Sequence, residues 1–218
     1  ALLLIGFGIQ DSLLPMLNKQ TTELTHCDLT ITLSDEKALT TENGLGDLLA
    51  SDTGISSWGR YYSKSVTLYN ANGDKDTVSI VAAEDEQQMT QYFTFRTRKG
   101  HKEVPFDDSS VILTEKTAER LGLSIGDTFE VETADGSRKS LTLTGITENY
   151  VFTRLYLSQS QLKALNGGTL PEWNTVYGLT DCPTDTARDT LRTSILACNY
   201  VSSVSFIEDI TQMFDGLI

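Results

Sequence analysis

Cysteine, histidine and proline are scarce in this chain. Its 218 residues include 3 cysteines, 2 histidines and 4 prolines, and the histidines, His26 and His101, lie far apart in the sequence. There is no His-Glu-x-x-His motif and no Gly-x-x-x-x-Gly-Lys-Ser/Thr loop that would cradle nucleotide phosphates. These absences argue against a zinc protease and against a nucleotide-hydrolysing domain. We therefore expect any ATPase that works with this protein to be a separate subunit or chain.

Positive charge is also scarce. The chain has 17 lysines and arginines against 30 aspartates and glutamates, which gives a formal net charge of −13. Its longest basic cluster is Arg96–Lys102. A surface of this sign repels phosphate backbones and anionic lipid headgroups. We therefore expect no nucleic-acid partner.

No apolar run reaches the roughly 20 residues that a membrane-spanning helix needs. The first nine residues are uncharged and almost wholly apolar, and polar residues follow at once. They lack the basic n-region and the cleavage site of a secretory signal. The expectation is that residues 1–9 are the outer end of a transmembrane helix and that the rest is the domain it carries. A buried N-terminal strand or helix is the alternative.

The three cysteines match no metal-binding spacing. Cys182 and Cys198 are close enough in sequence for a disulfide, which an extracellular location permits, but Cys198 also fits as a small buried residue. Cys27 is interpreted as a core residue. It adjoins His26, but neighbours on a strand point to opposite faces, which disfavours a joint metal site or a Cys-His pair.

Other side chains suggest no site. The acidic runs at residues 84–86 and 107–108 lack EF-hand spacing and are interpreted as solvated surface. The aromatic residues Trp58, Tyr61 and Tyr62 fit a sheet core better than a ligand surface. A glycosidase-type carboxylate pair stays open, because such pairs meet only in the fold. We assign no catalytic, cofactor-binding or metal-binding residue and expect no cofactor.

Hydrophobic periodicity predicts several elements before residue 110. Helices are expected over residues 11–25, 38–52 and 84–92, and a strand over residues 28–33. Two further strands, over residues 61–69 and 76–82, flank a turn that contains Asn72-Gly73. Because Asn-Gly is a strong hairpin signal, these two strands are expected to pair.

The segment from residue 110 to 149 has the clearest pattern. A strand over 111–114 leads into a helix that ends at Gly122, the residue type best able to take the left-handed conformation. Gly126 and Asp127 provide the bend into a strand over 128–132. Asp135-Gly136 then turns the chain back into a strand over 139–146. Each position has a structural reason, and none requires a substrate.

This pattern of Leu121-Gly122-Leu123, Gly126-Asp127-Thr128 and a hairpin closing on Thr144-Gly145-Ile146 resembles the extracytoplasmic domain of FtsX-like or MacB-like ABC transporter permeases. Residues 6–12 resemble the family's exit from a membrane helix. Residues 155–165 and 204–214 resemble its later strand–helix pairs, the last of which leads back to the membrane. Residues 35–105 carry little resemblance. A similar turn occurs in double-psi β-barrels, but the acidic surface and the apolar start argue against these.

The resemblance implies an α+β fold of mixed or antiparallel sheets with helices on one side, in two subdomains. It places both termini close together at a membrane-facing end. Residues 10–218 would form the extracytoplasmic domain, with 35–105 as an inserted subdomain and 10–34 and 106–218 as the membrane-proximal core.

The resemblance also implies a function. The domain would be non-catalytic, would lie on the extracellular side of the cell membrane, and would couple transmembrane motion to substrate export or to signalling. Its expected partners are a cytoplasmic ABC ATPase, a second permease in a dimeric transporter, and an extracytoplasmic protein or peptide. A secreted binding or adhesion module and an extracellular hydrolase are the alternatives.

Overall fold

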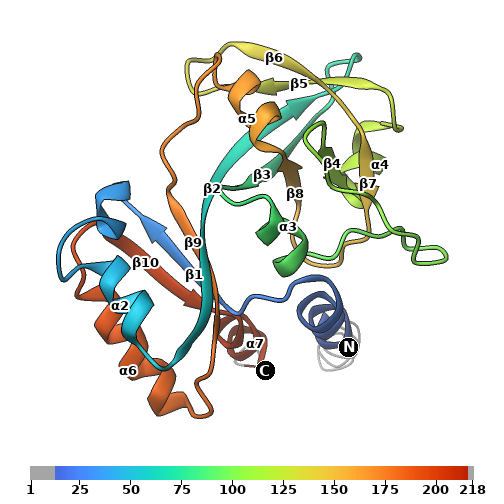
Figure 1. The fold of residues 1–218 in the computed structure, drawn as a ribbon. Coiled ribbons are helices and arrows are strands. Elements are labelled where there is room, and N and C mark those ends of the chain that lie inside the picture. Colours follow the sequence, from blue (N-terminus) through green and yellow to red (C-terminus); the bar gives the residue numbers. More distant parts are fainter. Residues whose placement is uncertain (1–12, 216–218) are drawn as a thin grey trace. The chain divides into compact units, whose positions relative to one another are not determined.

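The structure is a computed structural model that describes residues 13–215, with side chains through Met213 (Figure 1). It combines helices with a mixed β-sheet, so the predicted α+β class is confirmed. The chain forms two compact units. Unit 1 comprises the residues up to Arg60 and those from Glu172 onward, and unit 2 comprises Tyr61–Pro171. Unit 1 is therefore built from both ends of the described chain and unit 2 from its middle.

Unit 1 is a small antiparallel sheet with helices on one face. β1 pairs with β10 on one side and with β9 on the other, and β9 pairs with β2, which continues into unit 2. Its elements are a helix over residues 13–19, the π-helix Gln20–Leu24, β1 (Leu29–Leu33), the 3-10 helix Glu36–Leu39, α2 (Leu45–Ser51), β2 (Ile55–Tyr69), β9 (Thr175–Thr180), α6 (Asp185–Leu196), β10 (Val201–Phe206) and α7 (Ile207–Asp215).

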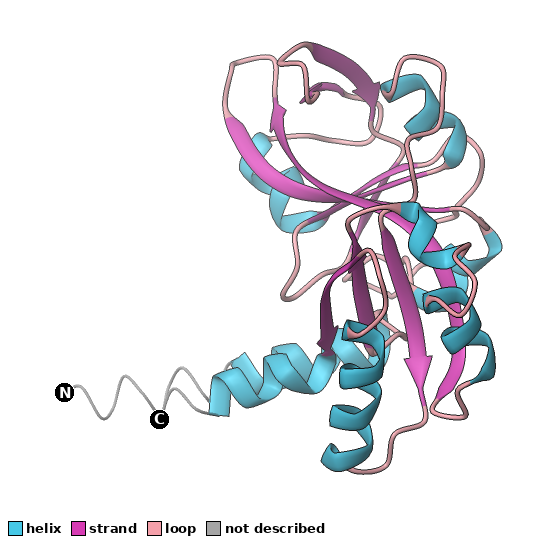
Figure 2. Ribbon diagram, turned by 90° about the vertical axis from the view of Figure 1, so that its left-hand side faces the viewer, coloured by secondary structure: helices cyan, strands magenta, loops and turns pink. Residues whose placement is uncertain are grey.

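The core of unit 1 lies between this sheet and two of its helices. Alternate residues of β1, Leu29, Ile31 and Leu33, are buried, as expected for a strand with one covered face. Leu191 and Ile195 of α6, four residues apart, pack into the same core as this face, together with residues of α2. Figure 2 shows the helices of this unit beside its strands.

Unit 2 is a mixed sheet in the order β2-β3-β8-β4-β7, with β5 pairing with the far end of β2 and β6 pairing with β5. β3 and β8 are parallel, as are β4 and β7, while β4 and β8 are antiparallel. Its remaining elements are β3 (Lys75–Ala83), α3 (Gln87–Tyr92), β4 (Val111–Thr114), α4 (Glu115–Leu121), β5 (Thr128–Glu132), β6 (Arg138–Thr142), β7 (Gly145–Thr147), β8 (Arg154–Leu157) and α5 (Gln159–Leu165).

Several predicted elements are confirmed. The strand at residues 28–33 is β1, and β2 and β3 form the expected hairpin, with Tyr69 opposite Lys75. The later strand–helix pairs are β8 with α5 and β10 with α7. α4 ends at Gly122, whose φ of +60° lies in the left-handed region that glycine tolerates best.

The prediction of one helix over residues 38–52 is wrong. The chain turns at Asn43, which has a positive φ of 53°, and only α2 is a regular α-helix there. At Gly46 the backbone approaches residue 39 so closely that a Cβ would lie 2.2 Å from the carbonyl oxygen of Leu39. Only glycine, which has no Cβ, permits this close approach. The approach occurs because the chain turns between residue 39 and α2, where the predicted helix is interrupted.

The strand predicted over residues 139–146 is also divided, into β6 and β7. Thr144 leaves the ladder with β5, and its backbone nitrogen donates to the carbonyl oxygen of Val111 at 2.9 Å. The units change at Arg60 and Pro171, whereas the sequence prediction divides the chain at 35 and 105. Which part faces a membrane stays a prediction. Residues 1–9 and both termini lie outside the described residues.

Candidate functional site

The two ends of the described chain join the sheet of unit 1 at one place. β1 begins at Leu29 and β10 ends at Phe206, and these residues are directly opposite each other in the antiparallel ladder. The backbone nitrogen of Ile207, the first residue of α7, donates to the carbonyl oxygen of Asp28 at 2.8 Å. The point where the N-terminal segment enters the sheet is therefore bonded to the point where α7 begins. We call these four residues the shared root.

Arg192 of α6 fastens the base of α7. Its guanidinium donates two hydrogen bonds to the carboxylate of Asp209, at 2.6 and 3.1 Å, and a third to the carbonyl oxygen of Val204 at 3.2 Å. It also lies 4.9 Å from the ring centre of Phe206. A planar guanidinium that makes two bonds to one carboxylate fixes orientation as well as distance. The direction in which α7 leaves the sheet is thus set by contacts within unit 1.

Asp209 holds this position as an ionised group. Burial by itself would raise the pKa of its carboxyl, but hydrogen bonds from Arg192 and from the backbone of Phe206, together with the charges of Arg192 and Arg188, lower that pKa below its usual value. The Phe206 nitrogen donates to Asp209 Oδ2 at 2.8 Å. A negative charge in the first turn of a helix is also favoured by the helix dipole. These contacts suit a mechanical joint.

The motif that carries the family resemblance forms a structural corner in unit 2. The Thr144 hydroxyl donates to the Val111 carbonyl oxygen at 3.1 Å and accepts from the Val111 nitrogen at 2.8 Å. A Cβ on Gly145 would lie 2.6 Å from a methyl carbon of Val104. Asp127 accepts the Ser124 nitrogen at 2.8 Å and closes the turn after α4. The motif therefore has the structural role expected of it.

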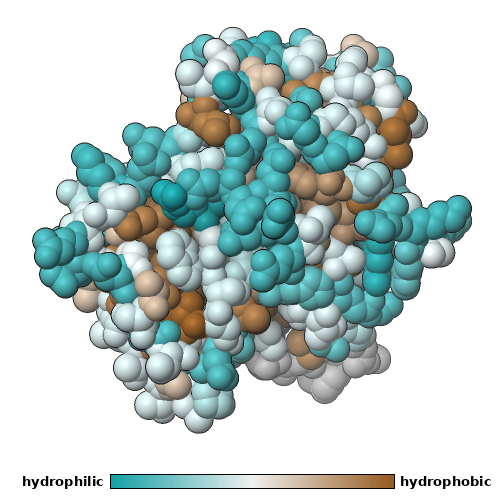
Figure 3. Space-filling model, viewed as in Figure 1, coloured by the Kyte–Doolittle hydropathy of each residue, from teal (hydrophilic) through white to brown (hydrophobic). Residues whose placement is uncertain are grey.

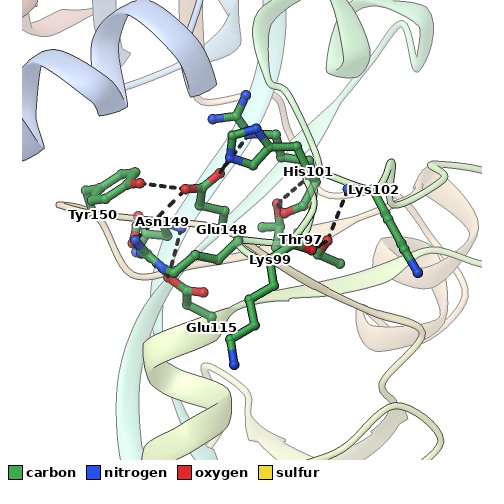
Figure 4. A network of polar contacts seen from close by, with 11 residues as sticks. Thr97, Lys99, His101, Lys102, Glu115, Glu148, Asn149 and Tyr150 are labelled. Atoms are coloured by element: carbon green, nitrogen blue, oxygen red, sulfur yellow. Dashed lines mark hydrogen bonds and ion pairs between the residues drawn. The ribbon is translucent and has the colours of Figure 1, made fainter.

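Unit 2 also contains a network of charged side chains around Glu148 (Figure 4). The Glu148 carboxylate, 1% exposed, accepts from Arg96 Nε at 2.7 Å and from the Tyr150 hydroxyl at 2.5 Å. Arg98 pairs with Glu115 of α4 and donates to the Asn149 carbonyl oxygen at 2.8 Å. The two arginines come from one loop, and their carboxylate partners come from α4 and the segment after β7.

The electrostatics of this network keep Glu148 charged. Burial would raise the pKa of Glu148, but the hydrogen bonds from Tyr150 and Arg96 and the charges of Arg96 and Arg98 lower it below its usual value. The hydrogen bond to Glu148 in turn raises the pKa of Tyr150. A buried carboxylate held ionised in this way is matched to its cations. Apart from the basic cluster at Arg96–Lys102, no motif or spacing in the sequence indicates these residues.

Three spacings typical of a nucleophilic serine were also missed in the sequence. Residues 122–126 read Gly-Leu-Ser-Ile-Gly, and Ser-x-x-Lys spacings stand at residues 34–37 and 160–163. A Gly-x-Ser-x-Gly elbow needs a strand-to-helix turn, whereas Ser124 lies in the turn between α4 and β5, which is a helix-to-strand connection. Lys37 pairs with Asp35 at 3.5 Å, and the Ser160 hydroxyl donates to the Asp108 carboxylate. None of the three spacings has the context of a catalytic serine.

The three cysteines, and His26 beside Cys27, also form no site. All three cysteines are free thiols, so the Cys182–Cys198 disulfide that the sequence left open is not formed. Burial raises the pKa of both thiols, which disfavours the reactive thiolate. Cys27 is buried, as predicted, and the neighbouring His26 is exposed.

The aromatic and acidic residues behave as structural groups. Tyr61 is fully buried and Trp58 packs against the core of unit 1, which agrees with a core role for both. Glu86 accepts the Gln159 nitrogen at 2.6 Å, and Asp107 accepts the Ser109 nitrogen at 2.9 Å. Within residues 13–215 no cluster of three or more His, Cys, Asp or Glu side chains is placed to bind a metal ion. None of the helices in this part of the chain has the length and apolar character of a membrane span.

Comparisons with known proteins find similar solved structures. No protein-family model and no curated protein matches the chain. It is similar to the periplasmic region of MacB from Actinobacillus actinomycetemcomitans, with 16% identity and a TM-score of 0.45 over 88% of this chain and 94% of that one. It is also similar to the extracellular domain of the noncanonic ABC-type transporter YknZ from Gram-positive bacteria, with 12% identity and a TM-score of 0.44 over 83% and 99%.

The predicted resemblance to MacB-like domains is confirmed as a resemblance. At TM-scores below 0.5 these likenesses carry no argument about function. The features of this chain that bear on its function are the pairing of Leu29 with Phe206 and the contact between Arg192 and Asp209.

Proposed function

We propose that this chain is the extracytoplasmic domain of an FtsX-like or MacB-like ABC transporter permease. It is a non-catalytic domain that couples the motion of two membrane helices to substrate export or to signalling to an extracytoplasmic partner. ATP is hydrolysed by a cytoplasmic subunit, and the intact transporter is a dimer. The observation that carries the proposal is the shared root, where Leu29 of β1 is paired with Phe206 of β10.

The geometry of unit 1 supports a coupling role. The N-terminal segment and α7 both connect to one sheet, and the contact between Arg192 and Asp209 ties α7 to α6. When a membrane helix moves the base of α7, this contact passes the displacement to α6, which packs on the sheet core. Rigid elements joined at fixed points transmit motion as hinge or shear displacements. Unit 1 is therefore the coupling unit in this proposal.

The flanking gene sequence tests the family assignment. We expect apolar spans of about 20 residues on both sides of this chain, and a gene for an ATPase nearby. A signal peptide directly before the chain and a stop codon directly after it would indicate a secreted binding or adhesion module. That result would overturn the proposal.

Cross-linking in the intact permease tests the coupling. One cysteine is placed in residues 13–19 and one on α7, and a bifunctional reagent joins them. We expect transport to be abolished while ATP binding is retained, because the two segments can no longer move separately. Unchanged transport after complete cross-linking would contradict the coupling role.

A matched control is a disulfide between Thr30→Cys and Ser205→Cys. These residues are directly opposite in the β1–β10 ladder, where paired α-carbons lie close enough for a disulfide. This bond joins strands that already move together. We expect the control variant to transport normally, so that loss of transport is specific to the helices.

A further inference from the structure

A basic hairpin projects from unit 2. Residues 96–103 fold back on themselves, with Arg96 opposite Glu103, and the Thr97 nitrogen donates to the Lys102 carbonyl oxygen at 2.8 Å. The Thr97 hydroxyl donates to the Lys99 carbonyl oxygen at 2.9 Å and accepts the Lys102 nitrogen at 3.1 Å. These bonds close the tip. Figure 1 shows the hairpin, in green, extending below β7 and α4.

Both arginines of the hairpin are bound within unit 2. Arg96 is held by buried Glu148, and Arg98 by Glu115 and by the ring of Tyr150, whose centre is 4.4 Å from the guanidinium carbon. The arginines thus anchor the hairpin at two points on the body of the unit. A loop anchored in this way presents its tip in one fixed conformation, which lowers the entropy cost of binding.

The lysines of the hairpin remain for other contacts. Lys99 and Lys102 are exposed, and among the described residues neither forms an ion pair. Figure 4 shows both side chains pointing away from Glu148. His101 is also exposed at the tip, with its Nε2 3.9 Å from the Glu148 carboxylate. Figure 3 shows hydrophilic side chains on this projection. Two uncompensated cations therefore lie together on a protein of net charge −13.

We propose that the tip of this hairpin, formed by Lys99, His101 and Lys102, docks on an acidic surface of an extracytoplasmic partner protein. Its placement on the extracytoplasmic side rests on the proposed function. The tip is a convex projection, which fits a protein surface better than a small ligand. Arginine recognises phosphate through two parallel bonds, and both arginines here are already paired internally. The remaining lysines act as point charges, which steer and orient an acidic protein surface.

The chain itself provides the test. Binding of a fluorescent polyglutamate peptide to the 218-residue protein is measured by anisotropy at low and high salt. We expect binding that weakens as salt rises, because exposed charges are screened. The double variant Lys99→Glu/Lys102→Glu is expected to bind about tenfold more weakly or worse. No binding by the unsubstituted protein would overturn the proposal.

A control variant shows whether binding depends on the position of the lysines or only on the net charge of the protein. Lys75→Glu/Lys116→Glu alters two exposed lysines elsewhere in unit 2 and changes the net charge by the same amount. We expect this control to bind the peptide nearly as well as the unsubstituted protein. An equal loss in both double variants would overturn the proposal, because the net charge alone would then explain binding.

Inorganic polyphosphate is the third probe. If it binds through Lys99 and Lys102 while polyglutamate does not, the tip is a site for phosphate-rich polymers and the proposed acidic protein surface is wrong. All three measurements use the isolated chain and no transport assay. Failure of the hairpin proposal and failure of the coupling proposal are therefore distinguishable.

Discussion

The two units use their ion pairs for different purposes. In unit 1, Arg192 and Asp209 join two helices at the place where the chain leaves the sheet. In unit 2, Arg96 and Glu148 fasten a surface hairpin to the body of the unit. The first contact serves the connection to the ends of the chain, and the second serves a projection from its middle.

The acidic residues of these two ion pairs, Glu148 and Asp209, also differ in how deeply they are buried. The side chain of Glu148 is 1% exposed and that of Asp209 is 36% exposed. Breaking a buried pair leaves a charge without solvent or counterion and is costly, whereas a more exposed pair is screened and easily re-formed. We therefore expect the ion pair that anchors the hairpin of unit 2 to contribute more to stability than the ion pair at the base of α7.

The largest expected effect is on unit 2. Glu148→Gln leaves Arg96, 17% exposed, without its counterion and should lower the free energy of unfolding by about 3 kcal/mol. Chemical denaturation gives the stability, and hydrogen exchange of the amides at residues 97–102 reports on the hairpin. The control is Glu119→Gln, on the exposed side of α4, which should change the stability little. Equal effects of the two substitutions would contradict a rigid anchor.

A second effect concerns the corner motif of unit 2. In Gly145→Ala the new methyl group would lie 2.6 Å from Val104 Cγ1 and 3.1 Å from Ile112 Cγ1. Overpacking of this kind should cost about 2 kcal/mol. Hydrogen exchange should rise in β4 and β7 while the amides of β1 keep their protection, because β1 belongs to unit 1. Equal loss of protection in β1 would show that the units do not unfold separately.

A smaller effect is expected at the joint of unit 1. Asp209→Asn keeps an oxygen that can accept the Phe206 nitrogen but removes the charge that pairs with Arg192. Because the group is more than a third exposed, we expect a loss of only about 1 kcal/mol in denaturation. The control is Asp189→Asn, which alters a weaker contact to Arg192 at 3.9 Å. A larger loss in the control would contradict the role of Asp209.

The pH dependence of this difference has a definite sign. The pKa of Asp209 is lowered in the folded protein, so its contribution to stability is fully present above the unfolded pKa of about 3.9. It is lost as the pH falls through the lower folded pKa. The stability difference between the unsubstituted protein and Asp209→Asn should therefore be constant near neutral pH and shrink in strong acid. A difference that grows as the pH falls would contradict the assigned ion pair.

Local chemistry explains which elements the sequence predicted. β1 alternates regularly, Gly122 ends α4, and the Asn72-Gly73 turn joins β2 to β3, so each has a short-range signal. β9 lacked one, because Gly178 interrupts its short apolar run. α6 does carry short-range signals that the prediction missed: the Thr184 side chain accepts the Ala187 nitrogen at 3.2 Å as an N-cap, and its buried residues Leu191 and Ile195 are four residues apart.

The charged contacts could not be predicted for a different reason. Arg96 and Glu148 are 52 residues apart, and Arg192 meets Asp209 only because β10 returns the chain to α6. No spacing rule connects such residues. The sequence did indicate the basic cluster at Arg96–Lys102, but only the fold separates its anchoring arginines from its exposed lysines. The corner motif, in contrast, could be predicted, because turn chemistry alone indicates its structural role.

The most direct test of the coupling claim is transport by the intact permease that carries Asp209→Asn. At equal abundance of the two proteins, we expect transport to fall about tenfold while ATP hydrolysis continues. A tenfold change lies within the usual range of coupling between two sites. Asp189→Asn should transport normally. Normal transport by Asp209→Asn would contradict the claim that the contact between α6 and α7 passes membrane motion into the domain.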